Sequence, residues 1–131
     1  MSFKLQIISP EKIFLSKESV KEVVLPAYEG EMGVLKDHIS IISFLKPGII
    51  KVYNSDNKAD YFYIEDGIIE FNDNCLTILT SKISDTKNLE KSEINQMIHD
   101  SEKELNNENI KDDTRYLINQ KLDTLRSLSL N

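Results

Sequence analysis

The most constraining feature of this 131-residue chain is the position of its glycines, prolines and aromatic residues. All four glycines, all three prolines and nine of the ten aromatic residues come before residue 85. The glycines and prolines are Gly30, Gly33, Gly48, Gly67, Pro10, Pro26 and Pro47. Because Gly and Pro separate short strands, we expect a β-rich domain over residues 1–84 and a domain of another kind over residues 85–131.

Short apolar or alternating segments fill residues 1–84. They are residues 3–7, 13–16, 20–25, 39–44, 49–53, 61–64, 68–71 and 76–79. Eight or more short strands at this spacing predict a sandwich or a barrel. Residues 39–44 are almost continuously apolar, which predicts a strand that is buried on both faces.

After residue 85 the apolar residues recur at helical spacing. One stripe consists of Ile94, Met97, Ile98 and Leu105, and a second consists of Leu117 or Ile118 with Leu122, Leu125 and Leu128. The polar residues 106–109 separate them, and Asp112 and Asp113 suit the start of a helix, where carboxylates face the positive end of the dipole. The pattern predicts an antiparallel helical hairpin.

Composition narrows the classes of function. The chain has 16 Lys and Arg against 22 Asp and Glu, a net charge of −6, so it lacks the basic character that nucleic acid or an anionic membrane surface requires. We therefore expect no nucleic-acid partner and no direct insertion into lipid. One cysteine, Cys75, and two histidines are too few for an internal disulfide or a Cys/His zinc site, so we expect no metal and no cofactor. The absence of a leader pattern after Met1 favours an untargeted, cytosol-facing protein.

The best enzymatic combination is Asp37 beside His38, with Ser40 or Ser43 as the nucleophile. Neighbouring residues on a strand point to opposite faces, so Asp37 orients His38 only within a turn. The sequence has no phosphate-binding loop and no dinucleotide-binding glycine pattern. We therefore interpret His38 as a surface or interface histidine, and a small hydrolase is the least favoured hypothesis.

Residues 26–38 carry the most distinctive polar pattern. Glu29 and Glu31 flank Gly30, Gly33 follows, and a Lys-Asp-His sequence precedes the next apolar segment. The segment is either an ordinary long hairpin loop or a rigid, protruding loop that carries acidic groups to a partner. We expect at least one of Gly30, Gly33 and Gly48 to have a positive φ.

Three segments, in order and at matching spacing, resemble the epsilon subunit of bacterial F-type ATP synthase. Residues 29–38 match the pattern E-G-x-x-G-[IV]-x-x-x-H, and residues 45–48 match L-[KR]-P-G. Residues 63–71 resemble the family's strand, Gly turn and apolar-Glu-apolar strand, and the similarity runs in register from about residue 5 to residue 79. The resemblance implies an N-terminal flattened β-sandwich of ten strands, followed by a C-terminal antiparallel α-helical hairpin.

The resemblance also implies a non-catalytic rotor part in the central stalk of the proton-translocating enzyme, bound to the gamma subunit and to the c-ring. Its expected location is peripheral, at the cytoplasmic face of the bacterial plasma membrane. The residues carried over to the c-ring interface are Glu29, Gly30, Glu31 and His38, with His38 in the same rim region as the acidic residues. The structural turns carried over are Gly33, Pro47, Gly48 and Gly67.

The helical tail of bacterial family members inhibits ATP hydrolysis, and the resemblance implies transient contacts with the alpha and beta subunits. On this chain those contacts are assigned to Arg115, Lys121 and Arg126. Some members bind ATP through [IL]-D-x-x-R-A at the start of the first helix, where this chain has Leu-Glu-Lys-Ser-Glu-Ile. Glu93 replaces the arginine and repels phosphate, so we expect no ATP site. The alternative to a rotor subunit is a free-standing binding module of the same fold.

Overall fold

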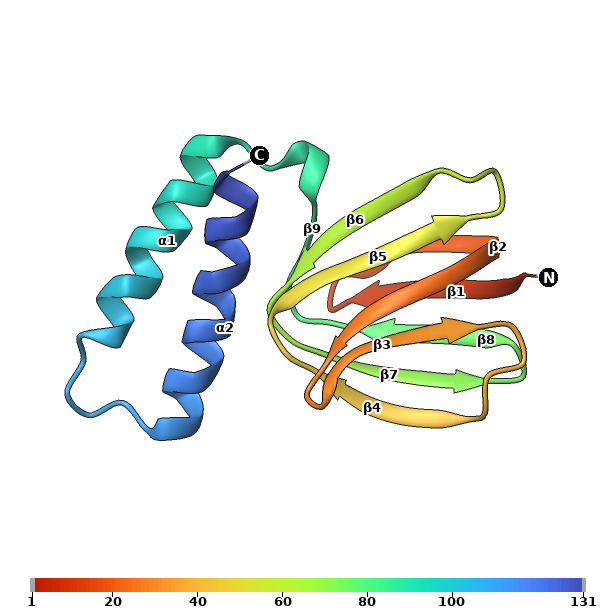
Figure 1. Ribbon diagram of the computed structural model, residues 1–131, viewed down its shortest axis with the longest axis horizontal. Helices are drawn as coiled ribbons and strands as arrows, with labels where there is room; N and C mark the ends of the chain where they lie inside the picture. Colours follow the sequence, from red (N-terminus) through yellow and green to blue (C-terminus); the bar gives the residue numbers. More distant parts are fainter. Residues whose placement is uncertain (1, 131) are drawn as a thin grey trace.

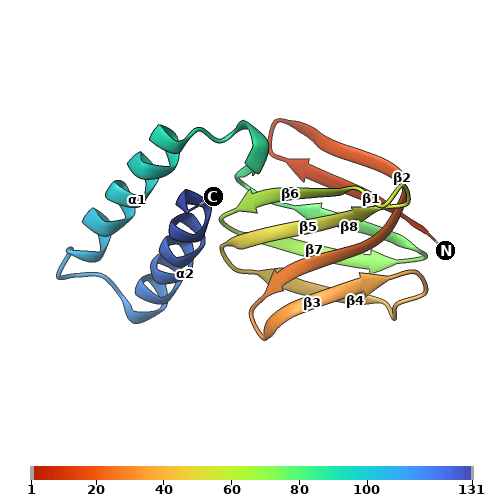
Figure 2. The same ribbon diagram turned by 45° about the horizontal axis from the view of Figure 1, so that its top comes forward.

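A computed structural model describes residues 2–130 (Figure 1). Its strands are β1 (Phe3–Ser9), β2 (Lys12–Ala27), β3 (Gly30–Leu35), β4 (Ile41–Leu45), β5 (Gly48–Asn54), β6 (Ala59–Ile64), β7 (Gly67–Asn72), β8 (Cys75–Leu79) and β9 (Ile83–Asp85). The 3₁₀-helix η1 (Thr86–Asn88) and the helices α1 (Lys91–Leu105) and α2 (Asp112–Ser129) follow. The strands form a two-layered sandwich, and the two helices lie side by side at one end of it (Figures 1 and 2).

Strand β2 joins the two layers. Its first half pairs with β1, which continues through β8 and β7 to β4 in one layer. Its second half pairs with β3 on one side and with β5 on the other, and β5 continues to β6 and β9. The sequence predicts separate strands at residues 13–16 and 20–25, but they are one 16-residue strand with register irregularities near Val20. The described residues therefore form nine strands rather than the expected ten, because this one long strand serves both layers.

The core lies between the layers and contains sixteen buried side chains of the described residues. Buried and exposed positions alternate along the strands, as in β7, where Ile69 and Phe71 are buried and Ile68 and Glu70 are exposed. Phe71 packs edge-to-face against Phe3 with 5.5 Å between ring centroids. The alternation that predicts the strands therefore also predicts most of the inward-facing side chains.

Residues 30–35 form strand β3, and the prediction of a loop over this stretch is wrong. β3 pairs with the end of β2 through six residue pairs. Its inward side chains are Met32 and Val34, whereas Glu31, Gly33 and Leu35 are exposed. Two apolar residues on one face are enough to hold an edge strand against the core, because the neighbouring strand supplies the backbone hydrogen bonds.

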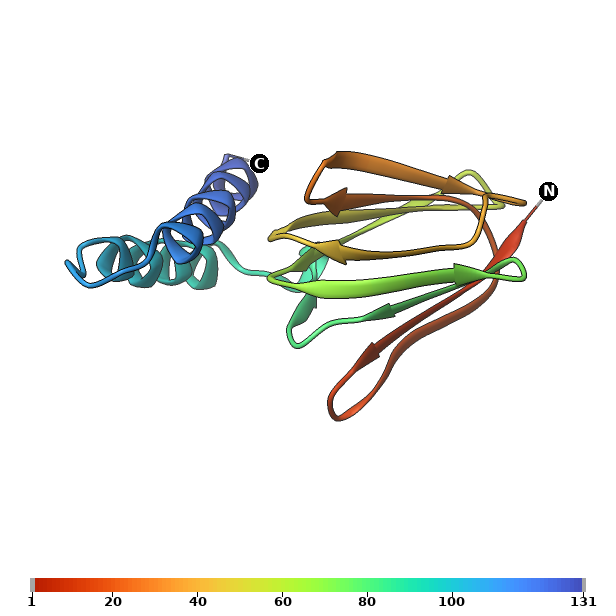
Figure 3. The same ribbon diagram turned by 90° about the horizontal axis from the view of Figure 1, so that it is seen from below.

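The prediction that residues 39–44 are buried on both faces is also wrong. Strand β4 begins only at Ile41, and its outward side chains Ile42 and Phe44 are 68% and 61% exposed. Leu45 faces the core from the same strand. No described helix or strand covers the outer face of this layer, because both helices lie at the end of the sandwich (Figure 3).

The helical hairpin agrees with the predicted stripes. The buried side chains of α2 are Ile118, Leu122 and Leu125, so Ile118 rather than Leu117 faces inward. The polar link spans residues 106–111, and Asp112 and Asp113 occupy the first turn of α2 as expected. Helix α2 lies between α1 and the sandwich (Figures 1 and 2).

Candidate interaction surfaces

Tyr28 and Glu29 form the turn that connects β2 to β3 at the end of the sandwich nearest the helices (Figure 1). We refer to this turn and the first two residues of β3, residues 28–31, as the acidic turn. Gly30 has a φ of 130°, which confirms that one of the three glycines named above has a positive φ. The Glu31 carboxylate lies 3.2 Å from the Lys51 Nζ, so its charge is partly compensated. Glu29 is exposed and has no ion pair with another residue of the described chain. Of the two predicted carboxylates, Glu29 is therefore the one free to meet a cation from outside.

Close backbone packing supports this turn. A Cβ at position 48 would lie 2.7 Å from the Pro26 Cβ, and the Lys46 N–H donates to the Pro26 carbonyl at 3.0 Å. Pro47 and Gly48 are buried and form the connection from β4 to β5. Gly48 is therefore required for a close approach rather than for a positive φ.

The two other predicted turn glycines have different surroundings. Gly33 lies within β3, where a Cβ would meet only the Glu22 carboxylate at 3.0 Å, so it forms no turn. Gly67 begins β7, and a Cβ there would lie 3.1 Å from the Leu45 Cδ1. Gly67 thus lets the start of β7 approach β4.

His38 lies away from the acidic turn, at the other end of β3. The six residues of β3 separate the two by about 20 Å, so the expectation of one shared rim region is wrong. The His38 N–H donates to the Leu35 carbonyl at 3.1 Å, and its Nδ1 lies 2.7 Å from the Ile39 carbonyl oxygen. Its ring packs edge-to-face on Phe71, with centroids 5.9 Å apart.

The same end of the sandwich argues against the hydrolase hypothesis. Asp37 has a φ of 66° and exchanges two hydrogen bonds with Asn74, at 2.7 and 2.9 Å, instead of orienting His38. The Ser40 hydroxyl donates to the Asn72 side chain at 3.1 Å. These residues tie the β3–β4 connection to the β7–β8 turn and form no nucleophile–base pair.

An exposed apolar row crosses the outer face of the layer formed by β4, β7, β8 and β1. Consecutive members are direct cross-strand pairs: Phe44 with Ile68, Ile68 with Leu79, and Leu79 with Ile8. Phe44, Ile68 and Leu79 are 61%, 42% and 47% exposed. Monomeric proteins rarely expose a contiguous apolar surface of this kind unless something binds to it. We refer to Phe44, Ile68, Leu79 and the half-buried Ile8, together with the exposed Ile42 two residues before Phe44 on β4, as the apolar row.

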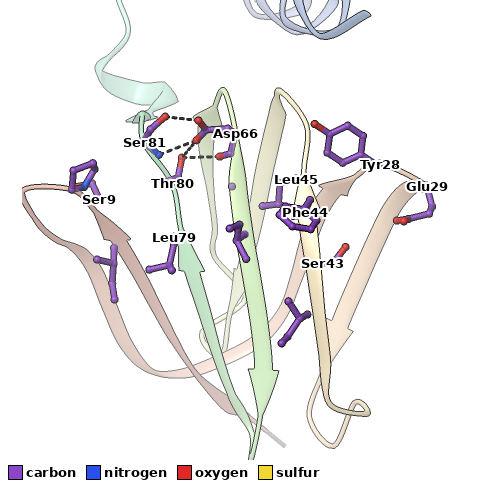
Figure 4. A pocket seen from close by; sticks show the side chains of 15 residues that line it. Ser9, Tyr28, Glu29, Ser43, Phe44, Leu45, Asp66, Leu79, Thr80 and Ser81 are labelled. Carbon is purple, nitrogen blue, oxygen red and sulfur yellow. Dashed lines mark hydrogen bonds between the residues drawn. The ribbon is translucent and has the colours of Figure 1, made fainter. Parts of the chain in front are cut away.

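The apolar row lines an open groove with polar ends (Figure 4). Tyr28 and Glu29 lie at one side of it, so the acidic turn borders the groove. On the other side, Asp66 accepts hydrogen bonds from the Thr80 hydroxyl at 2.8 Å and from the Ser81 N–H at 2.9 Å. These bonds fix the start of β7 beside the end of β8. The sequence does not predict this groove, although the apolar runs at residues 39–44 and 68–71 contribute side chains to its lining.

The helical hairpin contacts the sandwich through a small cluster. Tyr63, Ile94 and Leu125 are buried together, with half-buried apolar side chains around them. The Tyr63 hydroxyl donates to the Glu65 carboxylate at 3.0 Å, and the Lys121 Nζ lies 3.3 Å from the same oxygen. Burial, assisted by the nearby Glu65 charge, raises the pKa of Tyr63 well above its usual value, so the hydroxyl stays protonated.

Each of the three cations predicted to make inhibitory contacts has a partner within the chain. Lys121 pairs with Glu65 as above. The Arg126 guanidinium lies 2.9 Å from the Glu102 carboxylate of α1, and the Arg115 guanidinium donates to the Leu105 carbonyl at 3.5 Å.

The start of α1 shows what Glu93 does in place of a phosphate-binding arginine. Helix α1 begins at Lys91, and the Glu90 N–H donates to the Glu93 carboxylate at 3.4 Å. Glu93 thereby caps a free backbone N–H group of the first turn.

Residues 2–130 show neither a membrane-crossing helix nor a cluster of metal ligands. Neither of the α-helices there has both the length and the hydropathy that a membrane-crossing helix needs. That part of the chain also contains no group of three or more His, Cys, Asp or Glu side chains arranged to hold a metal ion.

Comparison with known proteins gives consistent matches. Residues 2–85 match the family model of the ATP synthase Delta/Epsilon chain β-sandwich domain. The chain is 53% identical to the ATP synthase epsilon chain of Pelagibacter ubique (strain HTCC1062) over 127 residues, covering 97% of each chain. It is 34% identical to the epsilon chain of Rhizobium etli (strain CIAT 652) over 104 residues, covering 79% of this chain and 76% of that one.

The fold also matches solved structures. A chain in the cryo-EM structure of the Euglena gracilis mitochondrial ATP synthase, comprising OSCP, F1 and the c-ring, has a TM-score of 0.78 at 22% identity. That match covers 98% of this chain and 80% of the other. A chain from the central stalk and c-ring of the Tetrahymena thermophila enzyme has a TM-score of 0.69 at 14% identity, covering 98% and 97%. The sandwich, the hairpin and the sequence matches together show that the chain belongs to the ATP synthase epsilon chain family.

Proposed function

We propose that this chain is a non-catalytic subunit of the central stalk of a rotary, proton-translocating ATP synthase, and that it links the gamma subunit to the c-ring. The observation that carries the proposal is the apolar row on an uncovered layer of the sandwich. Membership of the epsilon chain family supports it, as do structural relatives that come from assemblies containing a c-ring.

The apolar row is the proposed contact with gamma. Its centre is apolar and its ends are polar, as in stable protein–protein interfaces. Phe44 is the natural anchor, because an exposed aromatic side chain contributes much area at a low cost in side-chain entropy.

The acidic turn is the proposed contact with the c-ring. Glu29 offers a carboxylate that has no ion-pair partner among residues 2–130, Gly30 supplies the positive φ that directly follows the turn, and Glu31 adds a charge that Lys51 partly compensates. Carboxylates on a rim suit basic loops of a partner and speed its association. Because Glu29 borders the groove, a gamma subunit bound to the apolar row would lie next to a c-ring bound at the acidic turn. His38 lies at the opposite end and takes no part in this proposed contact.

The helical hairpin is the proposed regulatory part. Under this division, residues 1–84 connect gamma to the c-ring, and residues 85–131 inhibit ATP hydrolysis through transient contacts with alpha and beta. Arg115, Lys121 and Arg126 lie on α2, where an undocked helix would present them to acidic surfaces. The proposed location is peripheral, at the cytoplasmic face of the bacterial plasma membrane.

Replacement of Phe44 by Asp tests the gamma contact. Because Phe44 is 61% exposed, the sandwich should still fold, while a charge at the centre of the apolar row should abolish co-purification with gamma. Tyr116→Asp is the matched control, since Tyr116 is an exposed aromatic residue of α2 outside the groove. Full retention of gamma by a folded Phe44→Asp variant would exclude this surface.

Charge reversal tests the acidic turn. Glu29→Lys should weaken coupling of hydrolysis to proton pumping more than Glu31→Lys, because Glu31 already has a cation beside it. The double variant should have the largest effect at low salt. Unchanged pumping and c-ring association in the double variant would rule out the contact.

Truncation after Ser84 tests the division of labour. The shortened chain should assemble with gamma and support ATP synthesis, but should no longer inhibit hydrolysis. Loss of assembly, or equal hydrolysis rates with the full and the shortened chain, would contradict the regulatory role of the hairpin.

A further inference from the structure

A single carboxylate oxygen connects the hairpin to the sandwich electrostatically. The Glu65 Oε2 accepts from the Tyr63 hydroxyl at 3.0 Å and lies 3.3 Å from the Lys121 Nζ and 3.6 Å from the Lys82 Nζ. Tyr63 and Lys82 belong to the sandwich, whereas Lys121 belongs to α2. Among the ion pairs of residues 2–130, only Lys121–Glu65 joins α2 to the sandwich.

This pair is better shielded from water than the other ion pair that the described hairpin residues form. The side chains of Lys121 and Glu65 are 20% and 23% exposed, whereas both partners of Arg126–Glu102 are 51% exposed. Screening by solvent and salt is weaker at a half-buried pair, so its loss is felt more strongly. Removing Glu65 leaves the Lys121 charge partly buried without its ion-pair partner, and removing Lys121 leaves Glu65 with only Tyr63 and the more exposed Lys82, so either change disfavours the docked arrangement.

The apolar contact beside this pair is small. Tyr63 is fully buried, and it shares its cluster with one buried residue from each helix, Ile94 and Leu125. Its ring belongs to the apolar contact while its hydroxyl binds Glu65, so the apolar and polar parts of the docking interface meet at one residue. An interface with so few buried side chains depends strongly on each remaining interaction.

We propose that Glu65 is a latch that holds the helical hairpin on the sandwich through Lys121, and that docking thereby withholds a cation which the undocked hairpin presents to another subunit. The second half of this statement rests on the proposed regulatory function. The other two cations of α2 have partners inside the hairpin, so docking does not withhold them in this way.

Two substitutions separate the latch from the cation. Glu65→Gln breaks the latch and keeps every cation of α2, and its amide oxygen still accepts from Tyr63. Lys121→Gln breaks the latch and also removes the withheld cation. Lys82→Gln is the matched control, because it removes a cation from the same Glu65 oxygen without touching the hairpin.

Hydrogen exchange on the full-length chain measures docking without any other subunit. Glu65→Gln and Lys121→Gln should raise the exchange of the backbone amides in α2 by about tenfold, with the sandwich strands unchanged. Lys82→Gln should leave the exchange of α2 as it is in the parent chain. The charge swap Glu65→Lys with Lys121→Glu should restore protection that Glu65→Lys alone removes. Parent-like exchange in Glu65→Gln, or equal undocking by Lys82→Gln, would overturn the latch.

Hydrolysis by the assembled enzyme tests the withheld cation. Glu65→Gln should inhibit hydrolysis more strongly than the parent chain, and Lys121→Gln should inhibit less than Glu65→Gln although both are undocked. Equal inhibition by the two variants would overturn the role of the cation. If both variants undock the hairpin and neither changes the rate of hydrolysis, the latch is upheld. That result would instead contradict the proposed regulatory function.

Discussion

The sandwich and the helical hairpin differ most in the size of the apolar contact that holds each in place. Sixteen buried side chains of the described chain form the core between the two layers, whereas three form the contact between the hairpin and the sandwich. Each fully buried aliphatic or aromatic side chain contributes about 1.5–3 kcal/mol. The apolar contact that holds the sandwich together is therefore much larger than the one that attaches the hairpin to it.

The two regions also differ in whether a buried hydroxyl has a hydrogen-bond partner. Thr80, in the sandwich, donates to the Asp66 carbonyl at 2.8 Å and lies 3.1 Å from the Lys82 carbonyl oxygen. Ser101, in α1, is fully buried, and its Oγ has no hydrogen-bond partner among residues 2–130. An unsatisfied buried hydroxyl weakens the region that contains it. Both differences predict that the hairpin is held less tightly than the sandwich.

The largest effect is expected from a truncation in the sandwich core. Phe71→Ala should lower the free energy of unfolding by about 3–5 kcal/mol, because it leaves a cavity beside Phe3 and His38. Denaturant unfolding followed by circular dichroism would measure this loss. We expect the helices to unfold no later than the strands, since the hairpin loses its docking surface when the sandwich unfolds. A small loss of stability that is confined to the helices would contradict the conclusion that the sandwich core is the larger stabilising contact.

The matching truncation in the hairpin contact should act locally. Leu125→Ala removes one of the three buried residues of that contact and should weaken docking by about 2–3 kcal/mol. Hydrogen exchange should increase in α1 and α2 and stay unchanged in β7 and β8, where Phe71→Ala should increase it. Equal increases in both regions would show that the hairpin and sandwich form one cooperative unit.

Most of the fold follows from periodicity, because burying one face of a strand or helix requires apolar residues at a fixed spacing. The hairpin stripes and most strands are predicted on this basis. β3 is missed because only Met32 and Val34 face inward among glycines and charges. Burial of residues 39–44 is mispredicted because an apolar outward side chain, such as Phe44, looks the same in sequence whether or not another element covers it.

The candidate surfaces are less predictable than the fold. The motif places Glu29 and Gly30 in a loop, and the structure has Glu29 in the β2–β3 turn and Gly30 as the first residue of β3, but the motif gives no indication that an extended strand separates them from His38. The apolar row requires the register of four strands, since Ile8 and Leu79 are paired although they are far apart in sequence. The pairing of Lys121 with Glu65 likewise depends on how the hairpin docks, which no local pattern encodes.

A smaller effect is expected from filling the space at Gly48. Gly48→Ala should cost about 1–3 kcal/mol, because the new Cβ would lie 2.7 Å from the Pro26 Cβ in a rigid ring. Gly33→Ala is the matched control, since its Cβ would meet only the mobile end of the Glu22 side chain. Thermal unfolding of both variants should show the larger loss for Gly48→Ala. Equal losses would mean that close packing at the β4–β5 connection is not what Gly48 provides.

The smallest effect, and the only expected gain, concerns Ser101. Ser101→Ala should stabilise the docked hairpin by about 1 kcal/mol, because it removes a buried hydroxyl without a partner and introduces a better helix former. Thr80→Val, of nearly equal shape, should instead destabilise the sandwich by about 1 kcal/mol, since it leaves the Asp66 and Lys82 carbonyls without that donor. Hydrogen exchange in α1 and α2 should slow in Ser101→Ala, and the midpoint of sandwich unfolding should fall in Thr80→Val. Destabilisation by both substitutions would mean that the Ser101 hydroxyl is satisfied in solution, and the hairpin would then differ from the sandwich in contact area alone.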